Sequence, residues 1–254
     1  MLKQRVIPAL LLHREGLVKT RKFAEPKYVG DPLNAIRIFN EKEVDELLLL
    51  DISASREGRG PDYDLIQTFA TECFMPFCYG GGVRTLDQAE RLFRLGVEKV
   101  SLQTATRSDL SLITQIAGRY GAQAVVGAVD VKVDWKGSHQ LYWSVDKKTD
   151  RDWRGHIDRL VDAGAGEILI NAVDRDGMMG GMDLKLIREA TRNLDVPLIA
   201  LGGVGALEHI EAAVRAGASA VAAGSFFVFH GKHRAVLITY PSYATLETLL
   251  GPAK

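Results

Sequence analysis

The chain has 254 residues, a length that suits one α/β barrel or two smaller domains. Its 32 Lys and Arg residues balance its 32 Asp and Glu residues, which argues against a protein that holds nucleic acid through excess positive charge. Hydrophobic residues make up 46% and charged residues 25% of the chain, values typical of a domain with a sizeable core and unlike those of a disordered chain.

The sequence contains no run of about 18 apolar residues that would span a membrane. Its first residues, MLKQR, carry no signal-peptide pattern. Cys73 and Cys78 belong to no metal or disulfide motif, and we expect each to be a small buried apolar residue. These features predict a cytoplasmic protein without a metal or other cofactor.

Short apolar runs recur along the chain and predict eight strands that are buried on both faces. In chain order they are Val6–Leu11, Leu47–Ile52, Pro76–Tyr79, Lys99–Leu102, Ala124–Val129, Glu167–Ile170, Pro197–Leu201 and Ala220–Ala223. Segments with helical spacing lie between most of them, namely Pro32–Asn40, Leu86–Leu95, Leu110–Tyr120, Trp153–Ala163, Leu184–Arg192 and Leu207–Ala216. Asp31-Pro32 is typical of a helix start, and helix ends are marked by Gly96, Gly121, Gly164 and Gly217.

Strand–helix alternation of this kind predicts a parallel sheet, and eight strands in 254 residues favour a closed (β/α)8 TIM barrel over an open sheet. Residues 131–145 depart from the alternation, because two alternating runs flank Lys136-Gly137. We expect a β-hairpin there, in which Trp135, Tyr142 and Trp143 pair across the strands.

The chain repeats itself at an offset of 121 residues. Residues 76–105 align without a gap with residues 197–226, and glycines and apolar residues coincide along the alignment. This register predicts two (β/α)4 halves, at about residues 1–121 and 122–254, that close one barrel. It argues against a split into two domains.

Glycines follow the third and seventh predicted strands, and a Thr or Ser follows the fourth and eighth. In such a barrel the active site lies at the C-terminal ends of the strands, where glycine N–H groups, hydroxyls and helix N-termini bind phosphate. One glycine pair alone would indicate a tight turn, whereas two coupled copies favour two facing phosphate sites. The candidate phosphate-binding residues are Gly81, Gly82, Gln103, Thr104, Gly177, Gly203, Gly224 and Ser225.

The first strands of the two halves end differently. Acid–base chemistry in a symmetric barrel favours a carboxylate at both ends, but the second half has Asp130 where the first has Leu11. Other candidate catalytic carboxylates near strand ends are Asp51 and Asp176. Lys19 follows the first strand, either on a mobile loop that closes over a ligand or as an ordinary solvated lysine.

Four charged residues begin predicted strands at the opposite end of the barrel: Arg5, Glu46, Lys99 and Glu167. Two cations and two anions at one level predict a charged ring that closes the barrel floor. From spacing alone, ordinary salt bridges that stabilise the barrel are the simpler interpretation.

These motifs resemble those of the cyclase subunit of imidazole-glycerol-phosphate synthase, a half-barrel-repeat family of histidine biosynthesis. The resemblance covers nearly the whole chain and includes GDP at 30–32, LLLDISAS at 48–55, GGGV at 80–83, SLITQIA at 111–117, GAGEILI at 164–170, DRDG at 174–177 and GGVG at 202–205. It implies a (β/α)8 barrel in which ammonia from a glutaminase subunit enters through the floor. At the mouth, ammonia then attacks a bisphosphorylated aminoribonucleotide.

The resemblance also implies roles for individual residues. Lys19 matches the loop lysine of the family, and Asp130 matches one of its two catalytic aspartates. Asp45 and Glu98 lie on the face where the family docks its glutaminase. The ammonia gate of the family is matched by Arg5, Glu46, Lys99 and Glu167, and this match replaces the simpler interpretation of that ring.

Leu11 stands where the second catalytic aspartate of the family is expected, and four further departures are expected at the same mouth: Gln103, Asn171, Met178 and Leu201. A general acid or base contributes roughly 10²–10⁴ in rate, so we expect very weak histidine-pathway cyclisation. Leu11 and the segment 17–47 resemble a paralogous branch found in surface-polysaccharide gene clusters. Its members accompany a glutaminase and an ATP-dependent amidotransferase.

Three functions follow from these observations. The leading hypothesis is a subunit that channels ammonia within a class I glutamine amidotransferase complex. This complex would convert an N-acetyl group of a sugar into an acetamidino group during lipopolysaccharide (O-antigen) biosynthesis. The second is an authentic cyclase of the lyase type, in which Asp51 or Asp176 replaces the missing carboxylate. The third is a non-catalytic protein that senses a bisphosphate metabolite.

Overall fold

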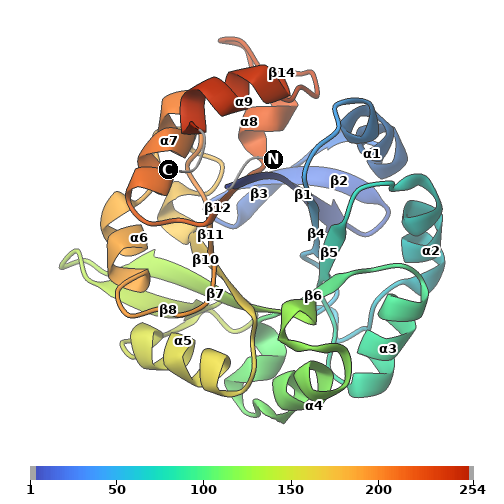
Figure 1. Ribbon diagram of the computed structural model, residues 1–254, viewed down its shortest axis with the longest axis vertical. Coiled ribbons are helices and arrows are strands. Elements are labelled where there is room, and N and C mark those ends of the chain that lie inside the picture. The colour runs from blue at the N-terminus through green and yellow to red at the C-terminus, as the bar shows by residue number, and fades with distance from the viewer. Residues whose placement is uncertain (1–3, 252–254) are drawn as a thin grey trace.

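The computed structural model describes residues 4–251, and its eight parallel strands close into one barrel (Figure 1). Each strand pairs with the next along the chain, and the last pairs with the first. In barrel order they are β1 (Arg5–His13), β4 (Leu47–Asp51), β5 (Phe77–Gly80), β6 (Lys99–Leu102), β7 (Val125–Val133), β10 (Glu167–Ala172), β11 (Leu198–Leu201) and β12 (Ala220–Ala223). The predicted (β/α)8 barrel is confirmed. The half-barrel boundary near residue 121 stays a prediction.

Helices encircle the barrel (Figure 1). They are α1 (Pro32–Glu41), α2 (Tyr63–Glu72), α3 (Leu86–Arg94), α4 (Ser111–Tyr120), α5 (Trp153–Asp162), α6 (Leu184–Ala190), α7 (Leu207–Arg215), α8 (Ser225–Val228) and α9 (Tyr243–Leu250), with short 3₁₀ turns η1 (Thr104–Arg107), η2 (Ala122–Ala124) and η3 (Val173–Arg175). The predicted start of α1 is confirmed, because the Asp31 side chain accepts from the Asn34 N–H at 2.9 Å and Pro32 is the first helical residue. Within residues 4–251, no helix is long and apolar enough to cross a membrane.

Further strands pair antiparallel with their neighbours in the chain: β2 (Gly16–Arg21) with β1 and β3 (Ala24–Gly30), β8 (His139–Trp143) with β7 and β9 (Lys148–Asp150), and β13 (Phe229–His230) with β14 (Ala235–Val236). The predicted hairpin is confirmed, since β7 turns at Lys136-Gly137 and pairs with β8. Trp135 does not pair across it but lies exposed at the tip. Tyr142 and Trp143 pair with β9 instead of β7.

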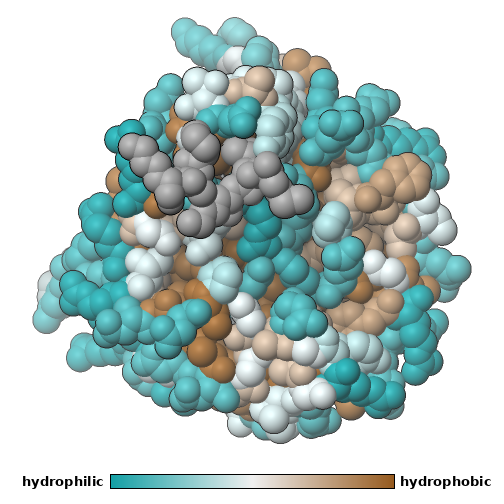
Figure 2. Space-filling model, in the orientation of Figure 1, coloured by the Kyte–Doolittle hydropathy of each residue, from teal (hydrophilic) through white to brown (hydrophobic). Residues whose placement is uncertain are grey.

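Two apolar layers surround the strands. The larger layer lies between strands and helices, which explains why the strand sequences are apolar without alternation. The smaller layer fills the barrel interior with residues of modest size, including Ile7, Ala9, Leu48, Cys78, Val126, Leu169, Ala220 and Ala222. Cys78 is buried as predicted, whereas Cys73 is only half-buried. The face of the molecule seen in Figure 2 is mostly hydrophilic, with apolar side chains gathered in patches.

Candidate functional site

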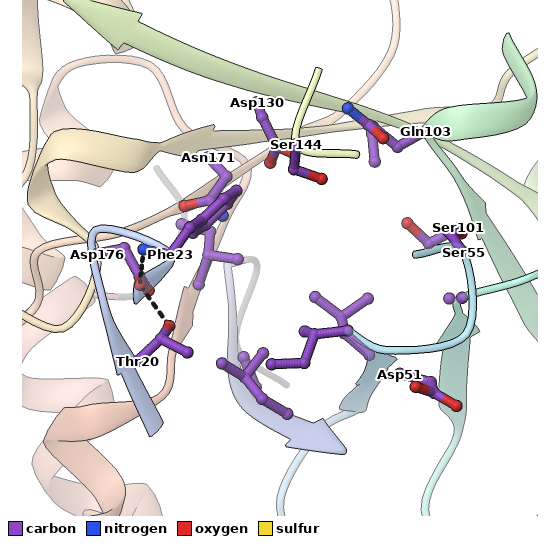
Figure 3. A pocket seen from close by; sticks show the side chains of 18 of the residues that line it. Thr20, Phe23, Asp51, Ser55, Ser101, Gln103, Asp130, Ser144, Asn171 and Asp176 are labelled. Carbon is purple, nitrogen blue, oxygen red and sulfur yellow. Dashed lines mark hydrogen bonds between the residues drawn. The ribbon is translucent and has the colours of Figure 1, made fainter. Parts of the chain in front are cut away.

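The C-terminal ends of the barrel strands surround one deep pocket, which we call the mouth (Figure 3). Its walls come from all eight barrel strands and from hairpins β2–β3 and β8–β9. The structure places every predicted catalytic and phosphate-binding residue on these walls: Leu11, Lys19, Asp51, Gly81, Gly82, Gln103, Thr104, Asp130, Asp176, Gly177, Gly203, Gly224 and Ser225. Met178 was expected there and instead lines a neighbouring depression beside Lys22 and His139.

Asp130 is the acidic group whose environment best suits proton transfer. It lies near the end of β7, next to Asn171 of β10 in the parallel register (Figure 3). Burial, and then the negative charge of Asp176, raise the pKa of Asp130 to about 7, while a hydrogen bond from the Asn171 side chain and the charge of Arg56 oppose the rise. A carboxyl group with this pKa exchanges a proton readily at neutral pH.

Leu11 occupies the position in β1 that matches Asp130 in β7. In the sheet it pairs with Leu50 of β4 and Val18 of β2. Leu50 and Leu201 line the mouth with it, so this side of the pocket is aliphatic. A second proton-transfer group is therefore missing from the position where the barrel symmetry would place it.

The Asp51 carboxylate is fully engaged in holding the loop that follows β4. Its Oδ1 atom accepts from the N–H of Ser53 at 2.9 Å and of Ala54 at 3.0 Å. The Arg59 guanidinium lies 2.9 Å from Oδ2. An arginine and two main-chain donors thus occupy both carboxylate oxygens, which gives Asp51 a structural role in this loop.

Asp176 fastens hairpin β2–β3 to the barrel. Its Oδ2 atom accepts from the Thr20 hydroxyl at 2.7 Å and from the Phe23 N–H at 3.4 Å (Figure 3). Burial raises the pKa of Asp176, although these two hydrogen bonds and the charge of Lys19 oppose the rise. Its geometry supports a positioning role, because both contacts hold the hairpin over the mouth.

Lys19 was expected on a loop or in solvent, and the structure corrects this expectation. It lies in strand β2 and is 4% exposed. Its Nζ atom donates to the Ala9 carbonyl at 2.6 Å. Burial lowers the pKa of Lys19 to about 8, while the charge of Asp176 opposes the decrease. The residue was misplaced because hairpin β2–β3 turns through Lys22 and Phe23, both at positive φ, without the glycine that usually marks such a turn.

The mouth glycines permit close backbone packing. Gly177 has φ +67°, and an added Cβ would lie 1.9 Å from the Thr20 carbonyl oxygen. Gly203 has φ +104°, with only 2.3 Å from a Cβ to the Gly181 oxygen. Tight turns therefore account for these glycines by themselves. Gly224 differs, because its φ is ordinary and the Lys19 ammonium nitrogen would lie 2.8 Å from its Cβ.

At the floor of the barrel, four side chains form a closed ring of alternating charge, which we call the charged ring: Arg5, Glu46, Lys99 and Glu167. The Lys99 Nζ atom lies 3.1 Å from Glu46 Oε1 and 3.2 Å from Glu167 Oε1. Arg5 closes the ring, with Nη2 at 2.8 Å from Glu167 and Nη1 against Glu46. Burial lowers the pKa of Arg5, but the two carboxylates outweigh it and raise that pKa.

Asp45 and Glu98, the predicted partner-contact residues, immediately precede the charged-ring residues Glu46 and Lys99. Glu98 is exposed. Asp45 is half-buried, and burial raises its pKa, while the Val6 N–H and the charge of Arg5 oppose the rise. Only Glu98 of the two is thus freely presented at this end of the barrel.

Comparison with known proteins gives the family. Residues 5–234 match the family described as "Histidine biosynthesis protein". The chain belongs to this family. A Pseudomonas aeruginosa protein named "Putative imidazole glycerol phosphate synthase subunit hisF2" is 54% identical over 97% of this chain and 99% of its own length. A Vibrio vulnificus protein named "Putative imidazole glycerol phosphate synthase subunit hisF3" is 50% identical over 95% of this chain and 94% of its own length.

A third member of the family, "Imidazole glycerol phosphate synthase subunit HisF" of Exiguobacterium sibiricum, is 40% identical over 89% of this chain and 91% of its own length.

Sequence patterns missed several other residues that line the mouth of this chain, including Phe23, Arg56, Ser101 and Ser144. Phe23 is held by its packing on Tyr142, with ring centroids 6.3 Å apart. This contact between two hairpins has no local sequence signal. Within residues 4–251, no cluster of His, Cys, Asp and Glu has the arrangement of a metal site.

Proposed function

We propose that this chain is the ammonia-conducting subunit of a class I glutamine amidotransferase complex. The observation that carries the proposal is the combination of a closed charged ring at the floor with Leu11 at the mouth. An entrance suited to a small polar molecule is kept, whereas one of the two expected proton-transfer groups is absent.

The face around the floor supports docking of a glutaminase subunit. Phe74 lies just before β5, at the same end of the barrel as Glu98, and is 85% exposed. Its N–H donates to the Asn40 side chain at 3.0 Å, which holds the backbone at this point. Exposed aromatic residues, Phe among them, are enriched at protein–protein interfaces.

The barrel interior supports passage of neutral ammonia and opposes passage of ions. Between the charged ring and the mouth, the interior layer is made of aliphatic side chains and Cys78. Desolvating an ion costs several kcal/mol in such surroundings, whereas a small neutral molecule avoids most of that cost. Ammonia released below the ring would therefore reach the mouth unprotonated.

At the mouth, Asp130 and the side chain of Asn171 provide polar groups, and Lys19 provides a cation. We propose that ammonia is passed on here for acetamidino-sugar formation in lipopolysaccharide biosynthesis, with an ATP-dependent amidotransferase as a further partner. A phosphorylated small molecule is the expected ligand. The complex would act in the cytoplasm without a metal or organic cofactor in this subunit.

Two experiments test the proposal. In the first, the purified chain is titrated calorimetrically with the class I glutaminase subunits of its own organism, and absence of binding to any of them would overturn the conduit function. In the second, cyclisation of the bisphosphorylated aminoribonucleotide is measured with saturating ammonium salt. We expect no turnover by the natural chain and partial turnover by Leu11→Asp, because a second acid–base group contributes roughly 10²-fold or more.

An authentic histidine-pathway cyclase is the second candidate, favoured by Asp130 with its raised pKa. It requires Asp51 or Asp176 to replace the missing carboxylate, but both are engaged with their own loop or hairpin. Robust turnover by the natural chain, together with rescue of a histidine auxotroph, would select this candidate.

A further inference from the structure

The two candidate phosphate cradles at the mouth correspond residue by residue at the offset of 121. The first-half cradle consists of Gly82, Gln103 and Thr104, and the second-half cradle consists of Gly203, Gly224 and Ser225. All six residues line the same pocket. A phosphate group needs hydrogen-bond donors, so the two cradles can be compared by asking which donors are still available.

In the first-half cradle the side-chain donors of Gln103 and Thr104 and the Gly82 N–H are already engaged. The Gln103 amide Nε2 donates to the Tyr142 carbonyl at 3.2 Å, and the Thr104 hydroxyl donates to Gln103 Oε1 at 3.0 Å. The Gly82 N–H points to the Ser55 hydroxyl at 3.3 Å. Gln103 thus links β6 to hairpin β8–β9 and takes up the hydroxyl of its neighbour. In the part of the chain that the structure describes, the Thr104 N–H has no acceptor.

In the second-half cradle the corresponding donors are open. Among residues 4–251, the structure gives no acceptor to the Ser225 hydroxyl, to the Ser225 N–H or to the Gly203 N–H. Ser225 is 9% exposed, and what remains exposed faces the pocket. Where Gln103 stands in the first half, the second half has Gly224, and the space of the missing side chain holds the Lys19 ammonium group.

The cations that line the mouth follow the same asymmetry. The Lys19 ammonium group is buried at the second-half end. One of its three N–H groups donates to the Ala9 carbonyl, so the other two can donate to a ligand. At the first-half end, the cations that line the mouth are Arg56, which is exposed, and Arg84, whose guanidinium donates to the Gly58 oxygen at 3.2 Å. Solvent weakens the attraction of such exposed cations for an anion.

We propose that the mouth binds its ligand through a single phosphoryl group, held by Lys19, Gly203 and Ser225, and that Gln103 closes the opposite cradle to a second one. The ligand class is therefore a monophosphorylated small molecule rather than a bisphosphate. The inference depends on the proposed function only in treating the mouth as a ligand site. Binding of a glutaminase at the floor is tested separately and neither supports nor weakens it.

The test is a site-resolved titration of the intact chain with inorganic phosphate, followed through backbone amide resonances at constant ionic strength set with sodium chloride. We expect the amides of Gly203 and Ser225 to shift together with one Kd, while those of Gly82 and Thr104 stay in place. Lys19→Met should raise that Kd at least tenfold, and Ser225→Ala severalfold, because each removes a donor to the anion.

Gln103→Gly copies the second-half residue into the first half, and Gln103→Ala serves as a second variant that keeps a side chain. Both should allow phosphate to shift the amides of Gly82 and Thr104. Ribose 5-phosphate and ribulose 1,5-bisphosphate then serve as matched probes. The natural chain should bind them equally, and Gln103→Gly should bind the bisphosphate at least tenfold more tightly. Equal shifts at both cradles of the natural chain, no shift at either, or no effect of both Gln103 variants would overturn the proposal.

Discussion

The contacts of Glu46 in the charged ring predict how much folding stability is lost when its charge is removed. This residue has a 4% exposed side chain and contacts both cations of the ring, with each carboxylate oxygen 3.1 Å from Lys99 Nζ. Glu46→Gln keeps the shape but leaves Arg5 and Lys99 with Glu167 as their one remaining carboxylate in the ring. Removing one partner of a buried ion pair costs about 3–5 kcal/mol. Arg5 and Lys99 are still 26% and 16% exposed, so solvent screening reduces the expected cost to about 2–3 kcal/mol.

Urea unfolding followed by circular dichroism measures this cost, and a loss of that size corresponds to a melting temperature lower by about 4–12 °C. Lys99→Met in the same chain restores the charge balance. We therefore expect the double variant to cost less than the two single variants added together, by at least about 1 kcal/mol. Glu57→Gln is the matched control, because Glu57 pairs with Arg59 near the surface and its loss should lower the stability far less than Glu46→Gln. Strictly additive costs, or a Glu46→Gln cost no larger than the control, would refute the ring as a coupled unit.

Three further predictions concern other parts of the molecule. His139 lies 3.0 Å from Asp183 and 3.2 Å from Glu189, and the hydrogen bond to Asp183 raises its pKa against the effect of burial. Its stabilisation is complete below the unfolded pKa of about 6.5 and is lost as the pH rises through the folded value. The stability difference between the natural chain and His139→Gln should therefore shrink with rising pH in urea titrations; a constant difference would contradict this. Phe74→Ala should weaken glutaminase binding by at least tenfold in calorimetry without lowering the melting temperature, and unchanged affinity would exclude a hot spot. Asp51→Asn should speed amide hydrogen exchange in the loop after β4 and destabilise the chain by about 1–3 kcal/mol. Unchanged exchange rates would show that the loop keeps its conformation without the Asp51 contacts.

The barrel was predictable because its strands carry their own signal. Strands buried on both faces need continuous apolar runs, and the observed strand ends agree with these runs to within a few residues. Aligning the first strands of the two halves, Arg5–Leu11 with Ala124–Asp130, places Leu11 and Asp130 at equivalent points, at an offset of 119 residues. The mouth was also predictable, because parallel strands in a closed barrel bring all their C-terminal ends to one side.

What the sequence could not provide were contacts between segments that rise above the barrel. Strand β3 is mostly exposed and contains Pro26, so it has no burial pattern to mark it as a strand. It is held through β2 and through the Thr20 and Phe23 contacts to Asp176. The same reason explains why the contacts of Asp51 were not predicted, since its selection as a catalytic carboxylate rested on its position at the end of a strand. Its engagement with Arg59 depends on the three-dimensional path of the loop.

The aliphatic surroundings of Leu11 affect how this protein can change over evolutionary time. Leu50 and Val18 are its neighbours in the sheet, and Leu201 lies on the same pocket wall. A carboxylate placed at position 11 would be poorly solvated there, and its charged form would be disfavoured. A single substitution at this position is therefore expected to restore only part of the cyclisation activity. Full acid–base chemistry would require changes at several positions. Each aliphatic neighbour therefore makes it less favourable to regain a carboxylate at position 11 by a single substitution.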